Sequence, residues 1–152
     1  MIEIKDKSLC SGCSACKNIC PKNAIEMLED ECGFKYPKIN KELCINCGLC
    51  NKVCPILNKK IGENNPKCYA CYNKDEKTRM NSSSGGIFSL LATEILNRNG
   101  VVFGATFNND FSLSHQYIEK IEDLDKLRTS KYLQSNIGDS YKQVKKFLNS
   151  VK

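Results

Sequence analysis

The chain has 152 residues, of which 41% are hydrophobic and 26% charged, and its formal net charge is +6. This length fits one medium domain or two small ones. No stretch approaches the run of about 18 apolar residues that a membrane span needs, so we expect a soluble, cytoplasmic protein. The basic residues are mostly scattered Lys, without a basic stripe that alternates with aromatics, so the charge does not indicate nucleic-acid binding.

The first part of the chain contains two copies of one cysteine motif. The copies are Cys10-x2-Cys13-x2-Cys16-x3-Cys20-Pro21 and Cys44-x2-Cys47-x2-Cys50-x3-Cys54-Pro55. This spacing binds [4Fe–4S] clusters, and in two-cluster ferredoxins the fourth cysteine of each run ligates the other cluster. The expected ligand sets are therefore Cys10, Cys13, Cys16 and Cys54 for one cluster, and Cys44, Cys47, Cys50 and Cys20 for the other.

Other uses of these cysteines fit the motif less well. A zinc site normally takes two separated pairs that close one tetrahedron, whereas each run here supplies four thiols. A disulfide framework needs an oxidising compartment, and residues 1–20 lack the apolar stretch of a secretory signal. The motif therefore predicts one-electron transfer. Clusters that only hold a docking domain together are the least favoured reading.

Glycine and proline mark the two runs. Gly12 and Gly48 lie between ligands, where a residue without Cβ lets backbone N–H groups approach inorganic sulfide. Pro21 and Pro55 follow the fourth cysteine of each run and should end the short helix that carries it.

The sequence around the runs predicts a small α+β fold. Ile2 and Ile4 alternate with charged residues, which favours a short edge strand. Residues 24–28 and 33–36 flank a polar turn and predict a hairpin. A domain over residues 1–60 has a marginal core, so we expect it to depend on its clusters and to be largely unfolded without them.

After a polar linker at residues 61–66, the pattern changes to that of an α/β domain. Residues 68–72 read as a strand, and apolar residues at helical spacing predict a helix from Ile87, with Gly100 at its C′ position. Residues 101–105 read as a buried strand. Strand, helix and strand in this order suggest a βαβ unit.

The last part of the chain contains weaker signals. Residues 116–118 favour a strand and residues 122–127 a short helix. Asp139 or Ser140 is expected to cap a final helix, whose apolar face would contain Tyr141, Val144, Leu148 and Val151.

A second chemical signal precedes the helix from Ile87. The loop contains Ser82, Ser83, Ser84, Gly85 and Gly86. Its hydroxyl and N–H groups would lie at the positive end of the helix, which suits the phosphate of a flavin or nucleotide. By itself such a run more often caps a helix or turns the chain.

Three stretches resemble the beta-subunit family of coenzyme F420 hydrogenases and dehydrogenases. They are residues 81–88, residues 100–105 and residues 130–135, and with the leading cysteine runs the resemblance spans nearly the whole chain. Members of that family are iron–sulfur flavoproteins that carry electrons between clusters and FAD, and some exchange hydride with a deazaflavin. The resemblance implies that Ser82–Gly86 approach FAD and that Lys131 reaches its phosphates or its ring.

The resemblance also implies a fold and a set of partners. We expect a two-cluster ferredoxin-like α+β domain over residues 1–60 and a partial α/β, flavin-binding-like domain over residues 67–152. The second domain is expected to be partial because the family continues past Val151 into a further strand and a glycine- and cysteine-containing turn. The chain would then belong to an anaerobic flavin-dependent oxidoreductase with a redox partner protein or a larger complex. The alternative is a ferredoxin-type carrier without flavin.

Four residues with reactive side chains fall outside these expectations. Cys68 and Cys71 would point to opposite faces of the predicted strand, so we expect small buried hydrophobic side chains, with zinc or a third cluster as the alternative. Cys32 is expected in the hairpin turn without a chemical role. His115 is the single histidine, and a structural or exposed position is expected for it.

Overall fold

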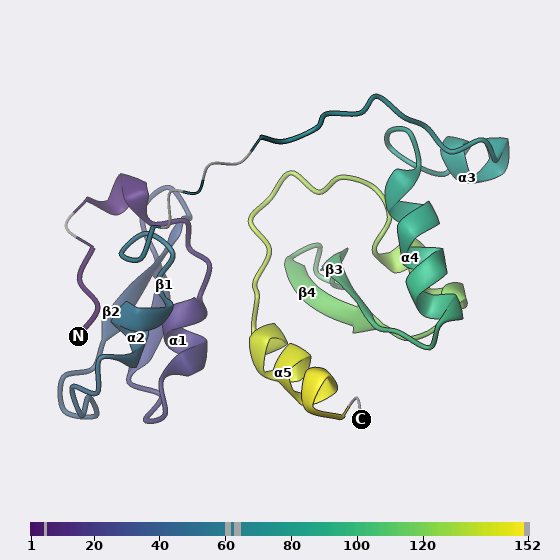
Figure 1. Ribbon diagram of the computed structural model, residues 1–152. Coiled ribbons are helices and arrows are strands. Elements are labelled where there is room, and N and C mark those ends of the chain that lie inside the picture. The colour runs from purple at the N-terminus through teal and green to yellow at the C-terminus, as the bar shows by residue number, and fades with distance from the viewer. Residues whose placement is uncertain (5, 60–61, 63–64, 151–152) are drawn as a thin grey trace. The chain divides into compact units, whose positions relative to one another are not determined.

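The computed structural model describes residues 1–152 except 5, 60–61, 63–64 and 151–152 (Figure 1). The chain divides into two compact units. The first comprises Met1–Glu63 with Ile137–Lys152, and the second comprises Asn64–Asn136. The final helix, which was expected in the second domain, therefore groups with the first unit. Of the expected linker at residues 61–66, residues 61, 63 and 64 lie outside the described residues.

The first unit combines short helices with a two-stranded sheet. Its elements are η1 (Lys7–Leu9), α1 (Ala15–Ile19), β1 (Ile25–Glu29), β2 (Lys35–Ile39), α2 (Leu49–Val53) and α5 (Ser140–Ser150). Strands β1 and β2 pair antiparallel, with Ile25 opposite Ile39, which confirms the predicted hairpin. In its turn the Asp30 carboxylate accepts hydrogen bonds from the N–H groups of Cys32 and Phe34, both at 3.0 Å.

The predicted edge strand at Ile2 and Ile4 is wrong, because residues 1–4 form no strand. Ile2 is 6% exposed and packs in a core with Ile25 and with the cysteines Cys16 and Cys54. The apolar residues at this end of the chain thus bury themselves against the cysteine loops, and the free energy of that burial does not require strand pairing.

The second unit contains a hairpin covered by helices. Its elements are α3 (Glu76–Met80), α4 (Ile87–Asn97), β3 (Val102–Phe107), β4 (Leu113–Ile118) and η2 (Ile121–Lys126). Figure 1 shows α4 beside the β3–β4 hairpin, and the core between them consists of Ala92, Leu96, Ile118, Leu124 and Leu127. The predictions of a helix from Ile87, of strands around residues 101–105 and 116–118, and of a short helix near 122–127 are confirmed. The strand at 101–105 was expected to be buried, but most of β3 is half-buried.

The predicted strand at residues 68–72 is wrong, and with it the βαβ unit. Strand β3 pairs antiparallel with β4, and residues 65–73 have no regular secondary structure. The N–H of Asn73 donates to the Gly85 carbonyl at 2.7 Å, and a Cβ on Gly85 would lie 2.8 Å from the Cys71 carbonyl oxygen. Contacts with the serine–glycine loop, and not a sheet, therefore hold this segment.

Helix α4 ends in a Schellman motif. Asn99 adopts the left-handed conformation with φ +58°, and its N–H donates to the Leu96 carbonyl at 3.0 Å. Gly100, which was predicted for that C′ position, comes one residue later and donates to the Ile95 carbonyl at 2.9 Å. A Cβ on Gly100 would lie 2.8 Å from the same oxygen, so the close approach explains the glycine.

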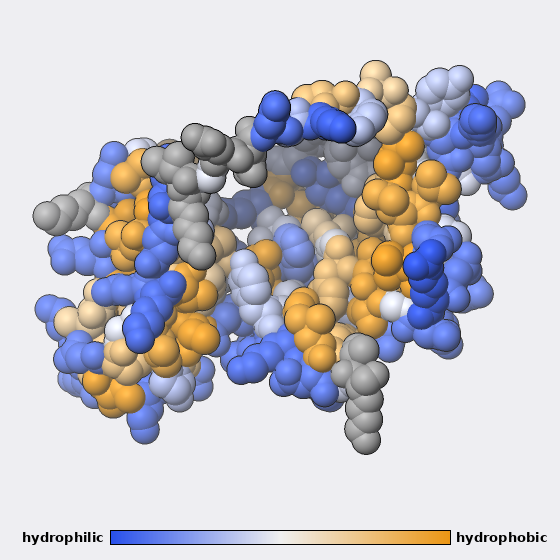
Figure 2. Space-filling model, viewed as in Figure 1, coloured by the Kyte–Doolittle hydropathy of each residue, from blue (hydrophilic) through white to orange (hydrophobic). Residues whose placement is uncertain are grey.

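Helix α4 is apolar on its outer side as well as on its buried side. Phe88, Leu91 and Ile95 are 42%, 62% and 45% exposed, and Figure 2 shows apolar residues gathered over this helix. No helix among the described residues is long and apolar enough to cross a membrane.

Candidate functional sites

The two cysteine loops have the same backbone conformation. The second residue after the first cysteine is left-handed in both loops, with φ +63° at Gly12 and +52° at Asn46. The fourth residue is left-handed as well, with φ +58° at Ser14 and +73° at Gly48. Gly12 and Gly48 are therefore not equivalent positions, and each loop places glycine at one left-handed position and a polar residue at the other.

Each loop leads into a helix of one turn that presents the fourth cysteine. Ser14 and Gly48 are the N-caps of α1 and α2, and Cys20 and Cys54 are the C-caps. The N–H of Cys20 donates to the Lys17 carbonyl at 3.2 Å, and the Cys54 N–H makes the equivalent bond at 3.3 Å. Because a proline follows each C-cap, the helix ends at the cysteine, as the sequence predicts.

The cysteines line two separate cavities in a crossed pattern. Cys54 joins three cysteines of the first run around one cavity, and Cys20 joins three cysteines of the second run around the other. The first cavity is lined by Cys10, Cys13, Cys16 and Cys54, and the second by Cys44, Cys47, Cys50 and Cys20. These are the groups that the motif spacing placed together. Four thiols around one cavity are the donor set that a [4Fe–4S] cluster takes.

Apolar side chains supply much of the remaining wall of each cavity. Ile2, Met27 and Pro37 contribute to the first wall, and Ile25 and Ile39 contribute to the second. Polar residues also line the cavities, namely Ser11 and Ser14 in the first and Lys22 and Asn46 in the second. An apolar wall limits the access of water to a bound metal centre and lowers the dielectric constant around it.

The cysteine thiols differ in burial. Cys16 is 7% and Cys54 is 6% exposed, whereas Cys47 is an exposed residue. Burial raises the pKa of the Cys16 thiol to about 11. The metal-free thiol is thus neutral at pH 7, and cluster binding must release its proton. The Cys20 sulfur accepts a hydrogen bond from the Ala24 N–H at 3.3 Å, which fixes its orientation.

The spacing of the cysteines around each cavity bears on the kind of metal group that they could bind. Within the described part of the chain, no three His, Cys, Asp or Glu side chains converge as one bound ion would require. Zinc holds its thiolates at about 2.3 Å from one centre. The cysteines here surround cavities instead, which suits a polynuclear group.

The comparison with known families decides between these readings. Residues 9–57 match the model of a family described as a 4Fe-4S dicluster domain. This match supports a bacterial-type ferredoxin domain. The dicluster domain holds two [4Fe–4S] clusters and indicates an iron–sulfur electron carrier. No curated protein matches the chain.

The second unit contains a larger pocket of about 450 Å³. Its walls come from the serine–glycine loop, the start of α4, strand β3 and the segment after η2. This pocket is lined by all six residues that the family resemblance links to a flavin, namely Ser82, Ser83, Ser84, Gly85, Gly86 and Lys131. Residues from two distant stretches of the sequence thus meet at one pocket.

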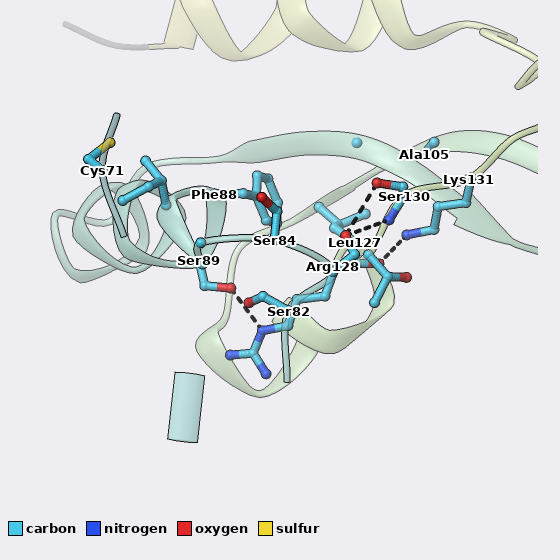
Figure 3. Close-up of a pocket in the computed structure, with 16 residues that line it drawn as sticks. Cys71, Ser82, Ser84, Phe88, Ser89, Ala105, Leu127, Arg128, Ser130 and Lys131 are labelled. Atoms are coloured by element: carbon cyan, nitrogen blue, oxygen red, sulfur yellow. Dashed lines mark hydrogen bonds between the residues drawn. The ribbon is translucent and has the colours of Figure 1, made fainter. Parts of the chain in front are cut away.

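Hydrogen bonds join the two stretches. The Ser130 N–H donates to the Ser83 hydroxyl oxygen at 3.1 Å, and the two hydroxyl oxygens are 3.2 Å apart. The Arg128 Nε donates to the buried Ser89 hydroxyl on α4 at 3.0 Å, as Figure 3 shows. The pocket wall is therefore fixed at two points, and Ser83 has a structural bond in addition to its expected role.

Two cationic side chains line the same pocket. The Arg128 guanidinium also pairs with the Asp125 carboxylate, and the Lys131 Nζ donates to the Arg128 carbonyl. Burial lowers the pKa of Lys131. Gly86, with φ +75°, is the N-cap of α4 and makes no side-chain hydrogen bond to the helix. Since the loop immediately precedes α4, it lies at the positive, N-terminal end of the helix. Together these charges suit an anionic ligand.

Sequence reasoning missed several residues of this pocket. Arg128 and Thr129 precede the Ser130–Ser135 stretch by one or two positions, but no spacing signal distinguishes them from surface residues. Thr129 has φ +69°, which is rare for a β-branched residue and marks a constrained backbone. Constrained backbone of this kind concentrates at ligand sites.

The other reactive residues have different surroundings. Cys68 and Cys71 are exposed, so the expectation that they are buried is wrong, and Cys71 lines the pocket of the second unit. Cys32 lies in the hairpin turn, as expected. The His115 Nδ1 is 2.9 Å from the Ser135 hydroxyl, and His115 does not line the pocket.

Proposed function

We propose that this chain is an electron-transfer component of an oxidoreductase similar to the F420 hydrogenase and dehydrogenase beta subunits. Single electrons would pass through the two [4Fe–4S] clusters to or from FAD. The observation that carries the flavin part is the pocket, where Ser82–Gly86 and Lys131 line the same walls although they are far apart in the sequence. The same proposal includes hydride exchange with a deazaflavin. It also includes a redox partner protein or a larger complex.

The proposed cluster ligands are the eight cysteines of the two runs. Their support is the crossed lining of the two cavities, together with the family match over residues 9–57. The apolar walls suit clusters that exchange electrons without exchanging ligands with water.

The residues of the second pocket fit a flavin nucleotide chemically. Arg128, Lys131 and the positive end of α4 would bind phosphate groups, and the serine hydroxyls offer hydrogen bonds. The aromatic ring of Phe88 and the side chain of Leu127 provide apolar wall. A bound flavin supplies the junction between one-electron and two-electron transfer that clusters lack.

The second candidate is a ferredoxin-type carrier without flavin. The match to the dicluster family favours this carrier, because the match covers residues 9–57, which contain the two cysteine runs. On this reading the pocket of the second unit serves another ligand or a partner.

Anaerobic purification and reconstitution, followed by cofactor analysis, test the proposal. About eight irons and eight sulfides per chain are expected, as two clusters require. The flavin site would be supported if the chain retains about one FAD and if Lys131→Met loses it. Lys145→Met is the control and should retain FAD, because Lys145 lies on α5 in the other unit. Full cluster content without FAD would leave the carrier as the function.

A further inference from the structure

The two cysteine runs are nearly identical in backbone, but their surroundings differ. Helix α5 contacts α1, which contains Cys16 of the first run and ends at Cys20. The Asn18 Nδ2 on α1 donates to the Gly138 carbonyl at 2.9 Å, just before α5 begins, and to the Ser14 carbonyl at 3.2 Å. Lys52 occupies the equivalent position in the second run, where it is exposed. The two runs therefore resemble each other in backbone but differ in their contacts with α5 and the segment before it.

Burial agrees with this asymmetry. Ser14 in the first loop and Ser140 at the start of α5 are each 7% exposed. Tyr141, in the first turn of α5, is partly covered, with 45% of its surface exposed. In the second loop, by contrast, Cys47 is exposed and Ile45 is 58% exposed.

We propose that α5 shields the first cysteine site from water and makes the two cluster sites electrochemically unequal. The inference rests on the proposed cluster ligands. Each oxidised cluster with four thiolates is an anion, and one-electron reduction adds negative charge. A site with less water stabilises that charge less well, so its midpoint potential is lower. The first site should have the lower potential, and the second should exchange electrons faster with an external one-electron reagent.

An anaerobic redox titration of the reconstituted full chain, followed by electron paramagnetic resonance, tests this asymmetry. The wild-type chain should give two separate midpoint potentials. Asn18→Ala removes the bond to Gly138 and should raise the lower potential toward the other, which stays unchanged. Leu148→Ala, at a position on α5 that is 69% exposed, is the matched control and should move neither. Equal potentials in the wild type, or an equal shift of both in Asn18→Ala, would overturn the inference.

Two further measurements make the outcome decisive. Cys13→Ser changes a proposed ligand of the first site and identifies which potential belongs to it. If Asn18→Ala loses iron, Tyr141→Ala tests the same shielding from the α5 side and should raise the same potential. Iron and sulfide analysis separates the two levels of failure, because a wild-type chain without eight irons contradicts the proposed ligands. A chain with full clusters and no response to either variant contradicts the shielding.

Discussion

The Ser130 N–H donates a hydrogen bond to the Ser83 hydroxyl oxygen at 3.1 Å, across 47 positions of the sequence. This bond connects the serine–glycine loop before α4 with the segment after η2. Both segments line the pocket of the second unit, so the bond holds the walls of the proposed flavin site together.

Ser83→Ala should therefore weaken the pocket without unfolding the unit. The substitution leaves the Ser130 N–H without its acceptor, and a lost hydrogen bond of this kind costs about 0.5–1.5 kcal/mol. We expect faster hydrogen exchange at the Ser130 amide and lower FAD retention, measured on the reconstituted chain. Ser150→Ala, at a hydroxyl on α5, is the control. Unchanged exchange at Ser130 would show that the bond does not hold the segment.

Cys13→Ala should destabilise both cluster sites, one directly and one through the shared fold. Cys13 lines the first cavity, and the helices that carry Cys20 and Cys54 pack against each other. Iron and sulfide analysis should show a loss of four or more irons per chain, because a [4Fe–4S] cluster requires all four ligands. Cys32→Ala, in the hairpin turn, should keep the full content. Full occupancy of both sites in Cys13→Ala would contradict the ligand assignment.

Removal of the clusters should unfold the first unit and leave the second largely intact. The core of the first unit contains two of the proposed ligands, Cys16 and Cys54, and the unit is small. The second unit has its own core around Leu96 and Leu124, which contains no cysteine. After chelation of iron, hydrogen exchange should lose protection in β1 and β2 but keep it in β3 and β4. Equal loss in both sheets would mean that the units do not fold independently.

Gly85→Ala should destabilise the second unit. The added Cβ would lie 2.8 Å from the Cys71 carbonyl oxygen and 3.2 Å from the Tyr72 Cα, and backbone atoms cannot move away easily. Overpacking of this kind costs about 1–3 kcal/mol. Thermal unfolding should show the loss, with Gly62→Ala as a matched control, because no atom lies within 4 Å of its added Cβ. Equal melting temperatures for both variants would contradict the close approach of the two segments.

The N-terminus of α3 should weaken in acid. The Asp75 side chain accepts a hydrogen bond from the Thr78 N–H at 2.8 Å, and its bonds with Thr78 lower the pKa of the Asp75 carboxyl below the ordinary 3.8. A lowered pKa in the folded state stabilises the cap above pH 3.8, and the effect is lost as the pH falls through the folded value. Hydrogen exchange at the Thr78 amide should accelerate over that range. Asp75→Ala should remove the pH dependence, and a persistent dependence would assign it to another group.

Local signals in the sequence predicted the elements that depend on local structure. Turn residues predicted the β1–β2 hairpin, and apolar residues at helical spacing predicted α4. Pro21 predicted that the first short helix ends at Cys20. The motif spacing also grouped the cysteines that line each cavity, although their role as ligands stays a prediction. The partners of α5 and of residues 68–72 were not predictable in the same way. The residue types at 68–72 are compatible with a strand, but contacts with Gly85, which only the folded chain brings near, decide the conformation of this segment.

Glycine and a polar residue exchange places at the two left-handed positions of the cysteine loops, and this exchange has a consequence for mutation and design. Gly12 and Gly48 occupy different positions of the same backbone path, and Asn46 and Ser14 occupy the complementary ones. Each loop thus shows that a non-glycine residue is tolerated where the other loop has glycine. A chain with asparagine and serine at all four places should still trace this path, at some cost in stability, whereas β-branched residues should not.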